Sequence, residues 1–194
     1  SKPNIPLGNP LTAEKVALGR QLFFDPILSA NRQVSCASCH LPELHFASPN
    51  PLAIGIKGQL GQRHAPTLVN RTYGTSFFWD GRAKTLEDQA LQPIENSLEL
   101  GFKVEGVLQR LRQDQQYDNL FQAAFPDGTT RTNLAKALAS FQRVLLSGDS
   151  PVDRFLAGDF NALTDSQRQG MWLFDSRAGC WKCHSGPNFT DEQF

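Results

Sequence analysis

The four cysteines of the chain occur in two copies of one short pattern, and each copy is followed at once by a histidine. The copies are Cys36-Ala-Ser-Cys39-His40 and Cys180-Trp-Lys-Cys183-His184, and no cysteine is left over. In the pattern C-x-x-C-H the two thiols can add across the vinyl groups of one haem, and the adjacent imidazole can then ligate the iron. The sequence therefore predicts two covalently bound c-type haems, with His40 and His184 as their axial ligands.

Other uses of paired cysteines fit this pattern less well. A four-cysteine zinc site also uses two C-x-x-C elements, but these usually recur at short spacing, whereas about 140 residues intervene here. A thioredoxin-like dithiol belongs in a βαβ unit, and the sequence shows no strand pattern. Structural disulfides would not explain a histidine after both pairs. Zinc and a redox dithiol stay open as alternatives, and haem attachment is the interpretation that uses every residue of both motifs.

The rest of the composition narrows the class of protein. The 194 residues include 19 basic and 19 acidic side chains, so the formal net charge is zero and no block of like charge is present. Binding to nucleic acid or to an anionic membrane surface is therefore not indicated. The longest apolar stretches, such as Val144-Leu-Leu146, are too short to span a bilayer. Because c-type haem is attached outside the bacterial cytoplasm, we expect a periplasmic or cell-surface-associated protein.

The elements that must position these motifs are helices joined by long loops rich in glycine and proline. The clearest helical pattern places Leu134, Leu138 and Phe141 on one stripe. The stretch from Leu41 to Tyr73 contains four prolines and is expected to be irregular, and beside a haem such a loop is usually functional. Helices are predicted from Thr12 to about Phe24, from Leu86 to Leu91, from Lys103 to Arg112, from Asn133 to Ser147, from Ser150 to Gly158 and from Thr164 to about Asp175.

These elements predict a mainly α protein with two cytochrome c-like haem domains. We place the boundary in the turn from Ser147 to Ser150, which gives domains over residues 1–148 and 149–194. A Phe-Asp pair ends the helix before each motif, at Phe24-Asp25 and Phe174-Asp175, which indicates a duplicated unit. Only ten residues follow His184, too few to wall both sides of a haem, so the second domain is expected to be incomplete in this chain.

A second set of distinctive residues lies between the two motifs. Phe78-Trp-Asp-Gly-Arg82 is followed by Gln89, by Pro93-Ile-Glu-Asn96 and by Glu99. Together with both C-x-x-C-H motifs and Ser147-Gly-Asp-Ser-Pro151, these blocks closely resemble the bacterial di-haem cytochrome c peroxidase family, which includes MauG. The resemblance runs in order over essentially the whole chain. It implies an enzyme that reduces hydrogen peroxide at the first haem, with electrons delivered through the second haem from a small cytochrome c or copper protein.

The resemblance also implies a role for particular residues. Residues 1–148 would form the peroxidatic domain and residues 149–194 the start of the electron-transfer domain. Trp79 matches a tryptophan that relays electrons between the haems, Gln89 and Glu99 match the pair in the distal pocket, and Pro93 matches a proline that packs over the open iron face.

The chemistry of these residue types agrees with those roles. A partly buried carboxylate such as Glu99 can carry a proton from the near to the leaving oxygen of peroxide. The amide of Gln89 can orient peroxide without changing charge. Taken singly, Trp79 would more often be core packing and Glu99 a solvated helix residue, but their joint spacing favours function. Asp80 and Arg82 are expected to form a structural ion pair, unless Arg82 contacts a haem propionate.

The chain departs from the family pattern at Ile56 and His64. Many members place at position 56 a histidine that caps the first iron in the resting oxidised state. Because isoleucine cannot ligate iron, the first haem should be open to peroxide without prior reduction, as in MauG. At position 64 the family commonly has an asparagine that ligates calcium. A neutral imidazole is a poor ligand for so hard a cation, so calcium is in doubt as a further cofactor.

Three alternatives to the peroxidase interpretation remain. A MauG-like enzyme would use a peroxide-derived, high-valent haem to oxidise a side chain of a partner protein, and Ile56 favours this mechanism. A non-catalytic di-haem electron-transfer cytochrome would keep both irons fully ligated. A haem-based sensor would bind peroxide or carbon monoxide without turnover.

Overall fold

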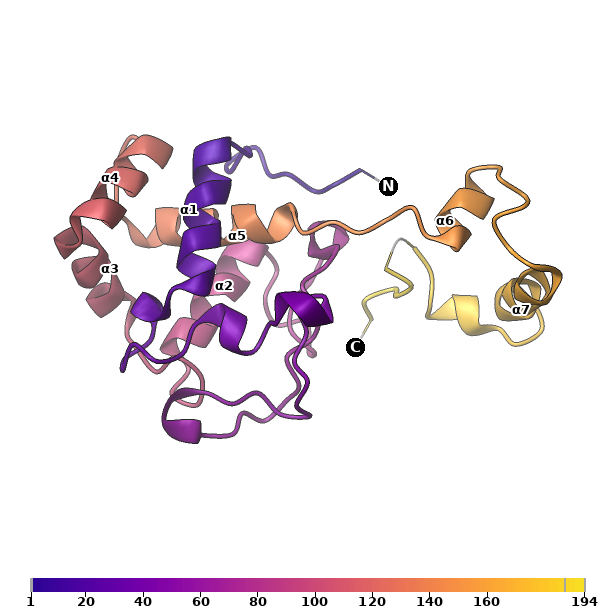
Figure 1. The fold of residues 1–194 in the computed structure, drawn as a ribbon, viewed down its shortest axis with the longest axis horizontal. Coiled ribbons are helices and arrows are strands. Elements are labelled where there is room, and N and C mark those ends of the chain that lie inside the picture. The colour runs from indigo at the N-terminus through magenta and orange to yellow at the C-terminus, as the bar shows by residue number, and fades with distance from the viewer. Residues whose placement is uncertain (1, 187, 194) are drawn as a thin grey trace.

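The computed structural model describes residues 2–186 and 188–193, and its regular elements are helices (Figure 1). In this part of the chain the only β-structure consists of three isolated bridges, Leu41–Ala47, Ile54–Leu60 and Phe77–Ala83. The predicted mainly α fold class is therefore confirmed. The helices are α1 (Ala13–Phe24), α2 (Leu86–Glu95), α3 (Val104–Gln113), α4 (Gln115–Ala124), α5 (Arg131–Arg143), α6 (Pro151–Leu156) and α7 (Asp165–Asp175).

The starts of α1, α6 and α7 follow the predicted caps. The Thr12 hydroxyl accepts a hydrogen bond from the Lys15 amide at the start of α1. Ser150 and Thr164 open α6 and α7, each in a reciprocal capping box with the third residue of its helix. None of the helices in the described residues has the length and apolarity needed to cross a membrane.

Three helices differ from the sequence prediction. The helix expected to end at Leu91 continues through Pro93 to Glu95, because burial of Ala90 and Ile94 outweighs the hydrogen bond that a proline cannot donate. Helix α4 was not predicted. Helix α5 ends at Arg143 instead of Ser147. Beyond α5 the Asn70 side chain bonds the Ser147 N–H and C=O, each at 2.9 Å, which holds the chain extended.

The core lies in the first part of the molecule, where α1 packs against α5. A Cβ atom at Gly19 would lie 2.0 Å from the Ala137 carbonyl oxygen, so glycine lets the two helices meet closely. Helices α2, α3 and α4 complete the main apolar cluster around Leu18, Ile94 and Leu134.

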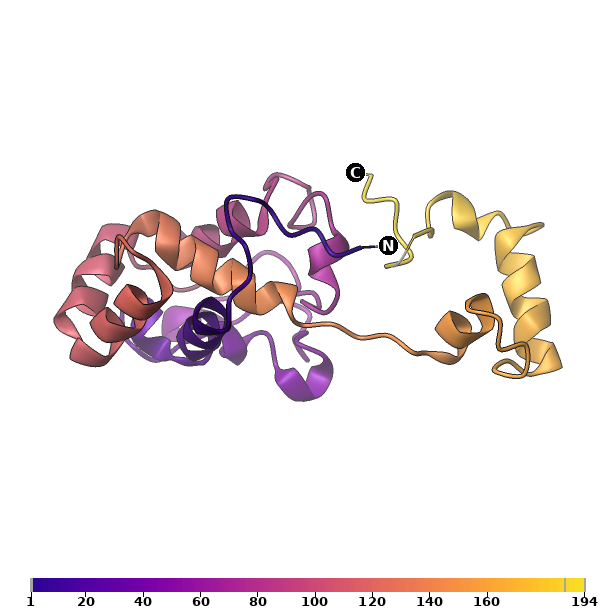
Figure 2. The same ribbon diagram turned by 90° about the horizontal axis from the view of Figure 1, so that it is seen from above.

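After α5 the chain runs extended and then forms α6 and α7, which lie apart from the first five helices (Figure 2). Leu163 is the only buried hydrophobic residue after Phe141 in the described part of the chain. The tail then returns to the first part, where the Asn188 amide donates to the Asn70 carbonyl at 3.1 Å. The predicted domain boundary falls in the extended segment, and its meaning for independent folding stays a prediction.

Candidate haem site

Three loops surround the first motif, and each is closed by one of the isolated bridges. The bridge Leu41–Ala47 closes a loop that presents Phe46, and Phe77–Ala83 closes the loop that carries Trp79. The bridge Ile54–Leu60 closes the loop that carries Ile56. The long irregular stretch of the sequence is thus fixed by short local pairings, and it places particular residues around the motif.

His40 is held in one orientation by its own loop. Its Nδ1 lies 2.9 Å from the Phe46 carbonyl oxygen, and because a carbonyl only accepts, Nδ1 carries the proton and Nε2 is free to ligate a metal. Burial lowers the pKa of His40 below its ordinary value, which keeps the imidazole neutral. Both effects suit the role of axial ligand that the sequence predicts for His40.

The two thiols of the first motif are uncharged and unpaired. Burial raises the pKa of Cys36 to about 12 and also raises the pKa of Cys39, and neither cysteine forms a disulfide in the described part of the chain. Within residues 2–186 and 188–193, no three His, Cys, Asp or Glu side chains gather as a metal cluster. The geometry therefore suits thioether formation better than a shared zinc ion.

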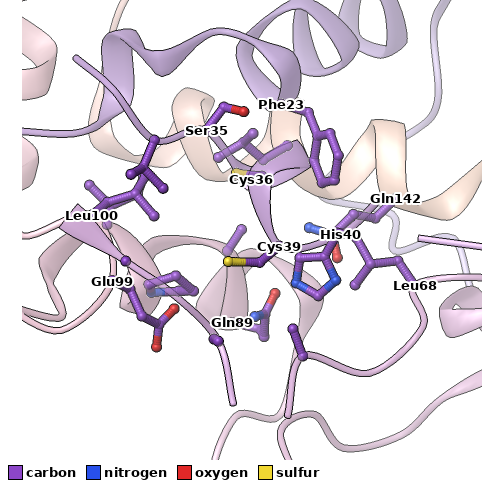
Figure 3. Close-up of a pocket in the computed structure, with 18 residues that line it drawn as sticks. Phe23, Ser35, Cys36, Cys39, His40, Leu68, Gln89, Glu99, Leu100 and Gln142 are labelled. Carbon is purple, nitrogen blue, oxygen red and sulfur yellow. The ribbon is translucent and has the colours of Figure 1, made fainter. Parts of the chain in front are cut away.

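A cavity lies beside these residues, and together with its open mouth it encloses about 670 Å³ (Figure 3). It opens into a wider hollow of about 1300 Å³, and His40, Gln89 and Glu99 line both. The apolar part of the lining of the smaller cavity includes Phe23, Ala65, Leu68, Ile94, Leu100 and Leu138.

The predicted distal residues come from α2 and the turn after it. Gln89 and Pro93 are one helical turn apart on α2, and both line the cavity together with Glu99. Figure 3 shows Cys39, the His40 ring, Gln89 and Glu99 around the same space. The structure thus brings together the first motif and three of the four predicted catalytic residues.

Glu99 is positioned by Asn96, a residue to which the sequence analysis gave no role. The Asn96 amide donates to a Glu99 carboxylate oxygen at 2.6 Å, and the Glu99 N–H donates to the Asn96 carbonyl at 3.0 Å. Burial raises the pKa of Glu99, although the Asn96 hydrogen bond and the Arg82 charge oppose this rise. A buried carboxylate with a raised pKa suits proton transfer near neutral pH.

Ile56 packs behind Glu99 and does not line either cavity. Its N–H donates to the Glu99 carbonyl at 2.8 Å, and a Cβ atom on Gly101 would lie 2.4 Å from its Cδ1. A Cβ atom on Gly55 would lie 2.0 Å from the Leu98 carbonyl oxygen, so this loop and the Glu99 turn are in backbone contact. Position 56 therefore supports the distal turn, and its side chain lies outside the cavity.

Trp79, the fourth predicted catalytic residue, lies on the wider hollow and not on the smaller cavity. It is 54% exposed, and its indole N–H donates to the His64 carbonyl at 2.8 Å. Next to it, Asp80 pairs with Arg63 at 2.8 Å and Arg82 at 2.9 Å, which confirms the predicted Asp80–Arg82 ion pair. The His64 ring bonds the Asn50 carbonyl at 2.9 Å, and this contact does not test calcium binding.

The second motif repeats the geometry of the first. His184 Nδ1 lies 3.1 Å from the Phe189 carbonyl oxygen, and His40 Nδ1 lies 2.9 Å from the Phe46 carbonyl oxygen. The ring of Phe174 lies 6.3 Å from that of His184, and the ring of Phe23 lies 6.4 Å from that of His40. The two motifs thus share a local arrangement, although the ring beside His40 belongs to Phe23 and not to Phe24 of the predicted Phe-Asp pair. Unlike the first motif, Cys183 and His184 are exposed.

The first cavity fits a covalently bound haem. Its lining is largely apolar, with two thiols and an oriented imidazole, and it also holds one unsatisfied polar atom. Gln142, which is 5% exposed, lines the cavity, and its side-chain oxygen lacks a partner in the described structure. Such an atom calls for a polar group of a bound molecule or an ordered water. The sequence analysis missed Gln142 because only the tertiary fold brings it to the cavity of His40, and it missed Phe46 because no motif marks the local loop that carries it.

This fold and this pair of sites define a c-type haem protein, and comparison with known proteins identifies its family. A family model described as di-haem cytochrome c peroxidase matches residues 13–161. The chain therefore belongs to the di-haem cytochrome c peroxidase family, as its motifs predict, and membership implies covalently bound c-type haems.

The similar proteins include some named MauG and others named cytochrome c peroxidase. The methylamine utilization protein MauG of Methylorubrum extorquens is 44% identical over 193 residues, which cover 97% of this chain and 54% of that protein. The cytochrome c peroxidase Ccp of Escherichia coli is 40% identical over 183 residues, which cover 94% of this chain and 39% of that protein. A crystal structure of a MauG-like protein associated with microbial copper homeostasis matches with a TM-score of 0.88 and 32% identity, covering 100% of this chain and 59% of that one. The chain thus spans about half the length of the curated relatives it matches.

Proposed function

We propose that the protein is a di-haem c-type peroxidase that reduces hydrogen peroxide at the site of His40. The observation that carries this proposal is the cavity in which His40 and its two cysteines face Gln89, Pro93 and Glu99. A carrier of electrons alone has no need of a buried carboxylate and amide on the open side of a haem cavity. Electrons would enter through the His184 site from a small cytochrome c or copper protein in the periplasm.

The residues on the distal side would divide the work as follows. Bound haem supplies the iron that binds peroxide and the redox equivalents for O–O cleavage. Glu99 takes the proton from the near oxygen of peroxide and returns it to the leaving oxygen, as its burial and its raised pKa favour. Gln89 orients peroxide by hydrogen bonding, and Pro93 with the apolar lining limits access of water.

Trp79 is the proposed relay between the two motifs. Its indole N–H is satisfied by the His64 carbonyl, which fixes the ring on the wall of the wider hollow. An aromatic ring held there offers an oxidisable group on the rim of the first site. Its partial exposure leaves one side of the ring available to a second redox centre.

The proposal is tested by Glu99→Gln in the haem-loaded protein. We expect peroxide turnover with a reduced cytochrome c donor to fall by about 10²- to 10⁴-fold, because a positioned general acid–base group is lost. Both haems should stay attached, as read from the absorption spectrum. The matched control is Glu105→Gln, whose side chain is 72% exposed on α3 and outside both cavities. Undiminished turnover in Glu99→Gln contradicts the role of Glu99.

A MauG-like oxidation of a partner protein is the second candidate, and Ile56 favours it. No imidazole stands at position 56, and the loop is pinned to the Glu99 turn. We therefore expect the oxidised protein to react with peroxide without prior reduction, which stopped-flow spectroscopy measures. Reaction followed by fast consumption of a reduced cytochrome c supports peroxidase. Slow consumption of that donor, with oxidation of a protein side chain, supports the MauG-like role. Unchanged haem spectra would contradict both and favour a plain electron-transfer cytochrome.

A further inference from the structure

The tail of the chain carries one carboxylate that is bound by the first part of the molecule. Glu192 accepts hydrogen bonds from the Arg71 guanidinium at 2.9 Å and from the Thr75 hydroxyl at 2.9 Å. It also accepts from the backbone N–H groups of Thr75 at 2.6 Å and of Ser76 at 3.2 Å. Four donors from one short segment thus converge on a single side chain more than a hundred residues away in the sequence.

These contacts are stronger than those of an ordinary surface ion pair. The side chains of Arg71 and Glu192 are 23% and 12% exposed, so water screens the pair little. Burial alone would raise the pKa of Glu192, but the Thr75 and Ser76 hydrogen bonds and the Arg71 charge hold it below its ordinary value. Glu192 also has a φ of 55°, a left-handed conformation that is strained for a residue other than glycine. The bound carboxylate offsets this strain.

The four donors lie directly before the Trp79 loop in the chain, since that loop begins at Phe77. Arg71 also donates to the Ser76 carbonyl at 2.8 Å and lies over the Phe77 ring at 5.3 Å. Phe77 is the residue whose bridge to Ala83 closes the loop around Trp79. Any shift of the segment from Arg71 to Ser76 is therefore transmitted to the loop.

On its other side, Glu192 is next to a contact with the second motif. The Asp191 N–H donates to the Cys183 carbonyl at 2.8 Å, inside C-x-x-C-H. A short path of bonded residues thus runs from Cys183 through Asp191 and Glu192 to Thr75 and Ser76. Apart from the extended segment after α5, this path and the Asn188–Asn70 bond link the second motif to the first part of the molecule.

We propose that Glu192 is a positioning residue that fixes the second C-x-x-C-H motif relative to the Trp79 loop. The consequence for electron transfer rests on the proposed function, whereas the placement itself does not. Without the Glu192 contacts, the links between the second motif and the first part of the molecule in the described residues would be reduced to the Asn188–Asn70 hydrogen bond and the extended segment after α5. The groups that bind the Glu192 carboxylate thus belong to the same chain. The role of Glu192 is to set the distance and orientation between the two redox sites.

The test replaces Glu192 by glutamine in the haem-loaded protein. We expect the amide hydrogens of Thr75 and Ser76 to exchange about tenfold faster, because both lose a hydrogen bond to a charged acceptor. Electron redistribution between the two haems, followed after flash reduction of one of them, should slow several-fold while both haem spectra stay unchanged. The control is Asp165→Asn, an acidic side chain of α7 that is 94% exposed and distant from Arg71 in sequence.

Two further variants extend the test, and the first of them keeps it decisive if Glu192→Gln folds poorly. Thr75→Val removes only the hydroxyl donor and should give a smaller change in the same direction. Arg71→Gln combined with Glu192→Gln should slow redistribution no more than the larger single effect, because the two side chains act as one unit. Unchanged amide exchange, or faster exchange with an unchanged redistribution rate, overturns the proposal. Neither measurement uses peroxide, so failure of the peroxidase function is detected separately.

Discussion

At the residue scale, Asn96 controls the carboxylate on which the proposed chemistry depends. Its amide bonds Glu99 at 2.6 Å and thereby favours the charged form, while burial favours the neutral form. In Asn96→Ala we expect the pKa of Glu99 to rise further. Since the first proton transfer requires ionised Glu99, the acidic limb of the activity profile should move to higher pH.

The measurement is kcat/KM for peroxide as a function of pH. The deficit of Asn96→Ala should be largest at low pH and should shrink as pH rises, a pattern that general loss of stability would not give. Asn119→Ala on α4, where Asn119 bonds only Gln115 on the surface, is the matched control. A uniform loss at every pH would show that Asn96 does not act through the ionisation of Glu99.

Some functional residues could be predicted from the sequence and others could not. The difference is the distance along the chain between each residue and its partners. Cys36, Cys39 and His40 form a local motif, and their chemistry can be predicted from adjacent residues. Asn96 is three residues from Glu99, so the spacing Asn-x-x-Glu could have revealed it. Glu192 and Gln142 meet their surroundings only after the chain has folded, and no local pattern marks them.

At the scale of elements, a buried ion pair ties α2 to α5. Glu87 accepts from Arg143 at 2.7 and 2.8 Å and from Asn9 at 2.8 Å, and the Arg143 side chain is only 4% exposed. These helices carry Gln89, Pro93 and Gln142 into the cavity. The pair therefore supports the distal and rear walls of the site.

We expect Glu87→Ala to lower the free energy of unfolding by about 3 kcal/mol, because it leaves the Arg143 charge buried without a partner. Burial would raise the pKa of Glu87, but Arg143 and Asn9 hold it below its ordinary value of 4.5. The stabilisation is therefore complete above pH 4.5 and is lost as pH falls through the lower pKa of the folded state. Urea unfolding of the haem-loaded variant and the unchanged protein should differ at pH 7, and the difference should shrink below pH 4.5.

The control for this prediction is the exposed ion pair of Glu105 with Arg131. Its N–O distance is 3.3 Å and the Glu105 side chain is 72% exposed. We expect Glu105→Ala to change the free energy of unfolding by no more than about 0.5 kcal/mol. Equal losses in the two variants would contradict the importance given to burial.

Helix starts were easier to predict than helix ends. Thr12, Ser150 and Thr164 cap their helices through local side-chain bonds, which the sequence contains in full. The end of α5 depends on Asn70, which lies 77 residues from Ser147. The run of α2 through Pro93 depends likewise on burial against the rest of the core.

At the scale of the whole molecule, the two motifs sit in very different surroundings. The apolar clusters all come from residues before 146, so the first motif lies against a complete core. Helices α6 and α7 contain no buried residue in the described structure. Exposed apolar side chains on and between them are Leu156, Phe160, Trp172 and Leu173.

This difference predicts that attached haem orders the second part of the chain. Helices of 6 and 11 residues are too short to be stable by themselves, since isolated helices below about 12–15 residues are marginal in water. Within the described residues, helices α6 and α7 bury none of their own side chains, so a bound haem would supply apolar surface for them to pack against. In Cys180→Ala with Cys183→Ala we therefore expect hydrogen exchange of α6 and α7 to approach that of an unfolded chain, while α1 and α5 stay protected.

The matched variant, Cys36→Ala with Cys39→Ala, separates this effect from general destabilisation. Because Leu18, Leu22 and Leu138 are buried among other protein side chains, α1 and α5 should keep most of their protection without the first haem. Hydrogen exchange read by mass spectrometry compares the four helices in both variants. If α6 and α7 stay equally protected when the second haem cannot attach, their order does not depend on that haem and the prediction is wrong.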